Sequence, residues 1–137
     1  MLKEAIALEG GESVILMDSI SYVDDSDVNH VVVTGSHGGT SSGEYAMRLR
    51  MAGVVFNDAG VGRENAGIES LTLLQSIGVP AAAVSHETGK IGQAKDMWDH
   101  GIISHVNAEA SKRGVVAGQT TKEAVLKLLP DSHGSDS

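Results

Sequence analysis

Short runs of apolar residues recur along the chain, and most of them end in loops rich in glycine, hydroxyl or charged residues. Three consecutive valines at 31–33 predict a buried strand, because β-branched residues suit the interior of a sheet. Comparable runs predict strands at 13–17, 54–56 and 81–84. Apolar positions at helical spacing, clearest over 68–77, separate some of these strands. The pattern predicts helices near 42–52, 63–77, 91–100, 107–113 and 120–129.

Strands and helices alternate through the middle of the chain, which is typical of an α/β fold. We expect a single-domain three-layer sandwich, in which helices cover both faces of a mostly parallel, Rossmann-like sheet of about four or five strands. No linker divides the chain, so residues 1–130 are predicted to form one domain. The polar residues 131–137 are predicted to be a disordered tail.

Composition excludes several classes of partner and chemistry. The 137 residues carry a formal net charge of −8, which disfavours binding to nucleic acid and to anionic membrane surfaces. The chain has no cysteine, so it has no disulfide and no thiol nucleophile. The first residues lack the apolar stretch of a secretory signal, and no apolar run approaches the length of a membrane span. We therefore expect a cytoplasmic protein.

The first strand-end loop follows the valine run and combines glycines with hydroxyl groups and a histidine. Glycines let the backbone approach a ligand closely, and a helix that begins after them presents free N–H groups to an anion. A carboxylate or phosphate is the expected ligand, and the alternative is a flexible turn with an ordinary serine cap. The predicted binding residues are Gly35, Gly38, Gly39, Thr40 and Ser41, with Ser36 and His37 as catalytic candidates.

The second loop places Asp58 directly after a buried strand. A carboxylate there could act as a general base, orient a histidine or bind a substrate. Alternatively, Asp58 caps its own turn by accepting a hydrogen bond from the amide of Gly60. Gly60, Gly62 and Arg63 are predicted to contact substrate, with Arg63 as an anion clamp.

The third loop contains Ser85, His86 and Lys90, and it repeats the Ser-His pair of the first loop. Two histidines at neighbouring strand ends indicate acid–base catalysis or a metal site, although each could instead be a loop histidine bonded to backbone. We assign His86 as catalytic and Ser85 and Lys90 as substrate-binding. No metal is assigned, because the histidine spacing matches no metal motif, and the cofactor is left unknown. His105 is also a candidate, although it is less closely tied to a strand end.

Two segments resemble motifs of the short-chain dehydrogenases. The segment 34–39 resembles their opening Thr-Gly-x-x-x-Gly, and 57–60 resembles their Asn-Asn-Ala-Gly. In that family several βα units separate the two motifs, whereas one predicted helix separates them here. The catalytic Tyr-x-x-x-Lys pair is absent, so the resemblance assigns no family.

These observations predict a small enzyme, or the small subunit of a larger one. It would act on an anionic small molecule by hydrolysis or proton transfer, with His37 or His86 moving the proton and Asp58 assisting. One alternative is a non-catalytic regulatory domain that binds a nucleotide or phosphate. Another is a structural subunit, because small glycine-rich domains often assemble into homo-oligomers.

Overall fold

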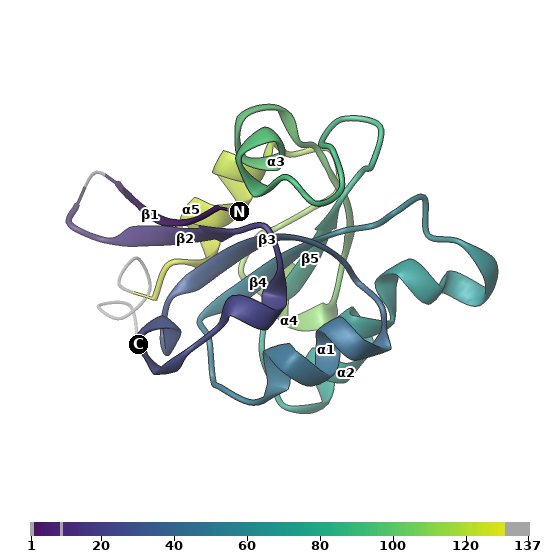
Figure 1. The fold of residues 1–137 in the computed structure, drawn as a ribbon, viewed down its shortest axis with the longest axis horizontal. Helices are drawn as coiled ribbons and strands as arrows, with labels where there is room; N and C mark the ends of the chain where they lie inside the picture. The colour runs from purple at the N-terminus through teal and green to yellow at the C-terminus, as the bar shows by residue number, and fades with distance from the viewer. Residues whose placement is uncertain (1, 9, 131–137) are drawn as a thin grey trace.

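The computed structural model describes residues 2–8 and 10–130, apart from the side chains of 63–65, so the predicted tail lies outside the described residues. A single six-stranded sheet forms the centre of the molecule, and its strands are ordered as they occur in the chain (Figure 1). The strands are β1 (Lys3–Ala7), β2 (Ser13–Met17), β3 (Val31–His37), β4 (Gly53–Asn57), β5 (Ala81–Val84) and β6 (Ile103–Val106).

The sheet is mixed, which corrects the expectation of a mostly parallel sheet of four or five strands. The strands β2, β3, β4 and β5 are parallel neighbours, whereas β1 and β6 add antiparallel strands at the two edges. The four central strands are the ones that the apolar runs predicted. The edge strands are harder to recognise because they are less completely buried than the central strands.

Helices cover both faces of the sheet, which confirms the α/β class (Figure 1). On one face, α1 (Thr40–Met47) and α2 (Glu69–Ser76) share a buried cluster with Val54 and Phe56. On the other, α3 (Ala94–His100) and α5 (Thr121–Leu128) pack with Val55, which points to the opposite side of β4. The short α4 (Ala108–Lys112) follows β6.

The sequential strand order does not support the Rossmann-like part of the prediction. Right-handed crossovers that always advance in one direction place their connections on the same face of the sheet. The three connections between β2 and β5 follow this rule, because η1 (Ile20–Tyr22), α1 and α2 all contribute to one buried cluster. The connection from β2 to β3 contains η2 (Asp25–Asp27) as well as η1. The strand order therefore lacks the reversal at which Rossmann folds bind their ligands.

The helix expected over 63–77 is divided into η3 (Arg63–Ile68) and α2. Gly67 lies at the end of η3 against the loop that follows β4, where an added Cβ would be 2.1 Å from the carbonyl oxygen of Asp58. Because this contact is backbone against backbone, η3 folds back onto the end of β4 and α2 begins only at Glu69.

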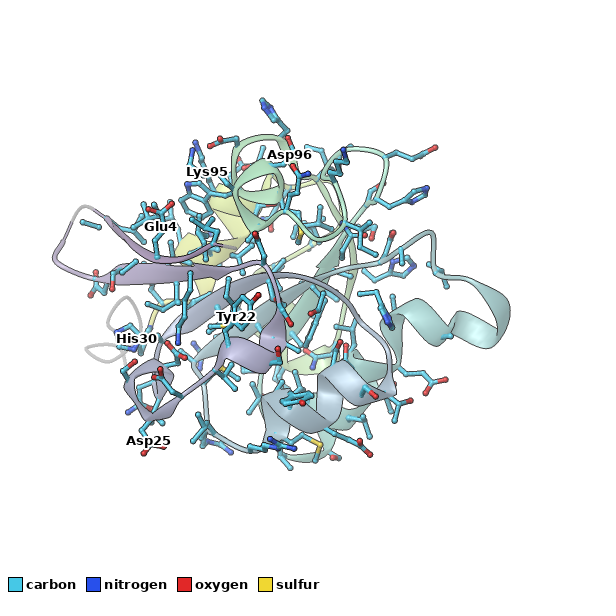
Figure 2. All side chains as sticks on the ribbon, in the orientation of Figure 1. Glu4, Tyr22, Asp25, His30, Lys95 and Asp96 are labelled. Carbon is cyan, nitrogen blue, oxygen red and sulfur yellow. The ribbon has the colours of Figure 1, made fainter. Side chains whose placement is uncertain are left out.

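Polar side chains at the amino ends of the strands lie apart from the loops that follow the strands. Asp25 and His30 are labelled at this end of the molecule in Figure 2.

None of the helices in the described part of the chain is long and apolar enough to cross a bilayer.

Candidate functional site

Asp58 is the centre of the candidate site. It follows β4 and is only 5% exposed. Its Oδ1 accepts hydrogen bonds from the amides of Gly60 (2.8 Å) and His86 (3.1 Å), and its Oδ2 accepts one from the Ser104 hydroxyl (2.7 Å). The predicted cap on Gly60 is therefore present. The same carboxylate also joins the ends of β4 and β5 to the start of β6, so turn capping alone does not account for it.

Two imidazole rings flank this carboxylate. The Nδ1 atom of His86 lies 3.4 Å from Oδ1 of Asp58, and Nδ1 of His105 lies 4.0 Å from Oδ2. His105 Nδ1 is also 3.0 Å from the Ser104 hydroxyl oxygen. Both rings remain accessible, since the side chains of His86 and His105 are 50% and 38% exposed. A buried anion thus lies beside two imidazole rings that can contact a molecule from solution.

The proton positions follow from the donors and acceptors present. An ionised Asp58 only accepts hydrogen bonds, and it lies closer to the Ser104 hydroxyl (2.7 Å) than the Ala83 carbonyl oxygen does (3.3 Å), so the single hydroxyl proton of Ser104 is directed to Asp58. The Ser104 oxygen must then accept from His105, which places a proton on Nδ1 of His105. The other ring nitrogen, Nε2, is left with a free lone pair, as a general base requires.

Hydrogen bonds keep Asp58 ionised. Burial favours the neutral acid, but hydrogen bonds from the Ser104 hydroxyl, the Gly60 and His86 amides and the His86 ring outweigh it, so the pKa of Asp58 lies below its usual value. A carboxylate that stays charged can stabilise an imidazolium beside it. Asp58 is therefore suited to orient and stabilise the histidines rather than to carry the proton itself.

An irregularity in the sheet brings Ser104 to Asp58. Ala83 pairs with His105 and Val84 with Ile103, so one step along β5 faces two steps along β6. Ser104 is the extra residue of this bulge. Bulges redirect side chains, and this one allows adjacent residues, Ser104 and His105, to contact the same carboxylate. Because β6 is antiparallel to β5, its first residues lie beside the carboxyl end of β5.

A pocket of about 480 Å³ opens beside His105. One wall is a face of α2 with Leu71, Thr72 and Gln75, and the other is the segment 105–108. Glu69, the first residue of α2, lines it as well. The volume is within the range of small-molecule sites, so a compact ligand could reach His105 from this pocket.

The loop after β4 is held in an uncommon conformation. Ala59, Gly60, Val61 and Gly62 all have positive φ, at 51°, 76°, 67° and 76°. This region is sterically costly for a β-branched residue such as Val61. Gly60 also packs against His86, since a Cβ there would lie 3.3 Å from Cε1 of the ring. Gly60 therefore holds Asp58 and leaves room for the imidazole, whereas a Cβ on Gly62 would meet no atom within 4 Å.

Most of the predicted residues of the first loop have contacts elsewhere. Gly35 packs against the backbone of Gly92, and the Ser36 hydroxyl accepts a hydrogen bond from the amide of Ile20 (3.0 Å). The His37 ring lies over Gly39, where a Cβ would be 2.4 Å from its Cε1. Among the described contacts, none joins this ring to Asp58.

The remaining first-loop residues lie around the start of α1. Gly38 packs against Gly67, and its carbonyl accepts a hydrogen bond from the amide of Ser70 (2.9 Å). The Thr40 hydroxyl donates to the carboxylate of Glu69, and Ser41 is exposed in the first turn of α1. The position that an anion was predicted to take is therefore next to an acidic side chain. Anion binding here stays a prediction.

The third loop contributes His86 alone to the cluster. The Ser85 hydroxyl accepts a hydrogen bond from the Glu87 amide (3.2 Å), which closes a local turn. Lys90 is exposed, and its amide donates to Asp96 (2.8 Å). Arg63 begins η3, and its side chain lies outside the described residues.

The sequence pattern gives no role to Ser104 and makes His105 only a lesser candidate. The expectation of a parallel sheet directed attention to residues that follow strands, whereas these two lie within an antiparallel edge strand. One signal was present: the pair Ser-His occurs at 36–37, 85–86, 104–105 and 132–133. The second and third of these pairs supply the two imidazoles beside Asp58.

The proposed proton positions lead to a direct prediction. Neutral His105 should carry its proton on Nδ1, because the Ser104 hydroxyl then satisfies both its 2.7 Å contact with Asp58 and its 3.0 Å contact with His105. Two-dimensional ¹⁵N–¹H NMR of the imidazole nitrogens at pH 8 measures this tautomer. In Ser104→Ala the Nδ1 preference of His105 should weaken while His86 is unchanged. A wild-type His105 protonated on Nε2 would contradict the assignment.

The described residues contain no group of three or more histidine, aspartate or glutamate side chains arranged to hold a metal ion. The geometry gives a reason, since both imidazoles turn Nδ1 towards the same carboxylate. Comparisons of the chain with protein-family models, with curated proteins and with solved structures found no significant match. The arrangement around Asp58 therefore carries the functional argument.

Proposed function

We propose that this protein is a small enzyme that transfers protons to or from a small molecule, in an isomerase, lyase or hydrolase type of reaction. One observation carries the proposal: a buried, ionised Asp58 is linked through the Ser104 hydroxyl to His105 at the wall of a pocket of about 480 Å³, with His86 beside its other oxygen. Oriented imidazoles with a charged partner are a common arrangement for general acid–base catalysis.

His105 is the proposed catalytic base. With a proton on Nδ1, it can accept another at Nε2 from a substrate or from a water molecule that attacks one. The resulting imidazolium is stabilised by Asp58, whose Oδ2 lies 4.0 Å from Nδ1. Ser104 is a positioning residue, because it bonds both groups.

His86 is the second proposed acid–base group. Its ring lies on the Oδ1 side of Asp58 and is half exposed, so it can exchange protons with solvent. Two imidazoles on one carboxylate can supply both the base and the acid that an isomerisation or elimination needs. The regulatory-domain alternative requires neither histidine, so replacing the histidines distinguishes the two functions.

The remaining sequence-based expectations belong to the same proposal. A cytoplasmic location, and assembly as a homo-oligomer or as a subunit of a larger enzyme, are consistent with a small glycine-rich α/β domain. Light scattering coupled to size-exclusion chromatography measures the assembly directly.

The test detects proton transfer itself, so the substrate need not be identified beforehand. Wild-type protein is incubated in D₂O with a panel of small amines, amino acids, carboxylates and phosphate esters, and ¹H NMR detects exchanged C–H positions or new products. For an active compound, His105→Gln should reduce turnover about 100-fold or more, because a positioned base contributes about 10²–10⁴-fold. His86→Gln should also reduce it.

His100→Gln is the matched control, because His100 ends α3 and lies outside the cluster. It should turn over the active compound at the wild-type rate. His37→Gln decides whether the first loop contributes to the reaction. If both His105→Gln and His86→Gln kept wild-type turnover, the proposal would be wrong.

A further inference from the structure

The described lining of the pocket beside His105 holds one formally charged side chain, and its charge is negative. Of the nine residues around it within the described part of the chain, Glu69 carries a carboxylate, and none is lysine or arginine. An anion placed there would meet this negative charge, and the described side chains of the lining include no lysine or arginine to balance it. A ligand with a positive group would instead pair with Glu69.

The neighbouring polar groups are engaged with one another. The side-chain oxygen of Gln75 accepts a hydrogen bond from the backbone amide of Glu109 (2.8 Å). The side-chain nitrogen of Gln75 donates one to the Glu109 carboxylate (3.3 Å). Asn107 makes four hydrogen bonds with backbone groups of Leu71, Val79, Ala81 and Ala110. These amides therefore build the wall of the pocket, and Glu69, Thr72 and His105 are left as its recognition groups.

Glu69 is held in place for such a role. One of its oxygens, Oε2, accepts a hydrogen bond from the Thr40 hydroxyl of α1, which fixes the carboxylate near the start of α2. Leu71 and Ala108 line the same pocket and supply apolar surface. The protein's formal charge of −8 also attracts cations at long range.

We infer that the pocket binds a small organic ammonium compound, with its positive group at Glu69, its apolar body against α2 and its reacting position near His105. The inference rests on the proposed function, because it takes this pocket as the substrate site. It favours the opposite substrate charge from the one predicted from the glycine-rich loop.

The experiment compares three ligands that share a benzyl or phenyl body and differ in charge: benzylammonium, benzyl alcohol and benzoate. Each is titrated into ¹⁵N,¹³C-labelled wild-type protein at pH 7.5 and low salt, and the signals of His105 and Ala108 report occupancy of the pocket. Benzylammonium should bind about tenfold more tightly than benzoate, since one ligand is attracted by Glu69 and the other repelled.

Glu69→Gln keeps the acceptor for Thr40 and removes the charge. It should weaken benzylammonium binding about fivefold and leave benzyl alcohol unchanged, as expected for a partly solvated ion pair. Glu44→Gln is the matched control, because it makes the same charge change at an exposed position of α1 and should have little effect. Thr72→Lys, on the exposed wall of α2, should reverse the preference towards benzoate.

Three results would overturn the inference: equal or tighter binding of benzoate, the same response in Glu69→Gln and Glu44→Gln, or ligand-induced shifts away from His105 and Ala108. If benzoate bound more tightly and Arg63→Gln abolished that preference, the ligand of this pocket would be an anion instead. The readout is binding rather than turnover. A binding result that contradicts this inference therefore leaves the acid–base proposal standing. A turnover result that contradicts the acid–base proposal leaves the measured binding preference intact.

Discussion

Asp58→Asn should reduce turnover about a thousandfold while preserving the fold, because an amide cannot stabilise the imidazolium form of His105 and disturbs the tautomers of both rings. The substitution is nearly isosteric, and its remaining oxygen can still accept from the amides of Gly60 and His86. The D₂O exchange assay measures the loss, and imidazole ¹⁵N shifts of His86 and His105 report the tautomers.

The same variant tests the charge of Asp58 through stability. Because its folded-state pKa lies below the unfolded value, ionised Asp58 stabilises the fold above the unfolded pKa, and this contribution is lost as pH falls through the folded-state pKa. Asp58→Asn should cost about 2 kcal/mol in the free energy of unfolding at pH 7. In urea unfolding, the difference in free energy of unfolding between the wild type and Asp58→Asn should become smaller below about pH 4.

Asp25→Asn is the control for charge, since Asp25 is exposed in η2 (Figure 2). It should change stability by less than about 0.5 kcal/mol across the same pH range. An Asp58→Asn variant with wild-type turnover and wild-type pH dependence would show that Asp58 only caps its turn.

Gly35→Ala should destabilise the fold by about 3 kcal/mol, although the residue was predicted to contact a ligand. Its added Cβ would lie 2.6 Å from the carbonyl carbon of Gly92 and 2.7 Å from the carbonyl oxygen of Asp18. These atoms are backbone on two neighbouring segments, and the Gly35 carbonyl also accepts a hydrogen bond from Gly92 (2.7 Å). The contact cannot relax by turning a side chain.

Gly62→Ala provides a contrast within the same set of predicted residues. Its φ is +76°, and an added Cβ meets no atom within 4 Å, so the cost is conformational alone and should be about 1 kcal/mol. Urea unfolding of both variants measures the difference. If Gly35→Ala cost no more than Gly62→Ala, the close packing of Gly35 against 92–93 would be incorrect.

Together these predictions separate two roles for the glycine loops. At Gly35 and Gly38 the missing side chain lets backbone segments pack against each other. At Gly60 the missing side chain leaves room for the His86 ring, and the amide binds Asp58. Only the second role belongs to the candidate chemistry. A glycine-rich strand end is therefore an ambiguous signal when it is considered alone.

The local pattern of the chain was sufficient for the α/β class, the four central strands and the position of Asp58 and His86 after two of them. These features depend on short-range physics: runs of β-branched residues form buried strands, and polar residues after such runs lie at the edge of the sheet. The pattern did not predict that β1 and β6 pair antiparallel, because the direction in which an edge strand pairs depends on which neighbouring strand is available.

Which loops meet was decided by tertiary structure alone. The sequential strand order and the bulge between β5 and β6 bring Ser104 and His105, 46 and 47 positions along the chain from Asp58, to its carboxylate, and leave His37 outside the cluster. Pairing and register are set by the burial of whole sheet faces, which a local pattern does not contain. The pocket likewise exists only because α2 packs near the start of α4.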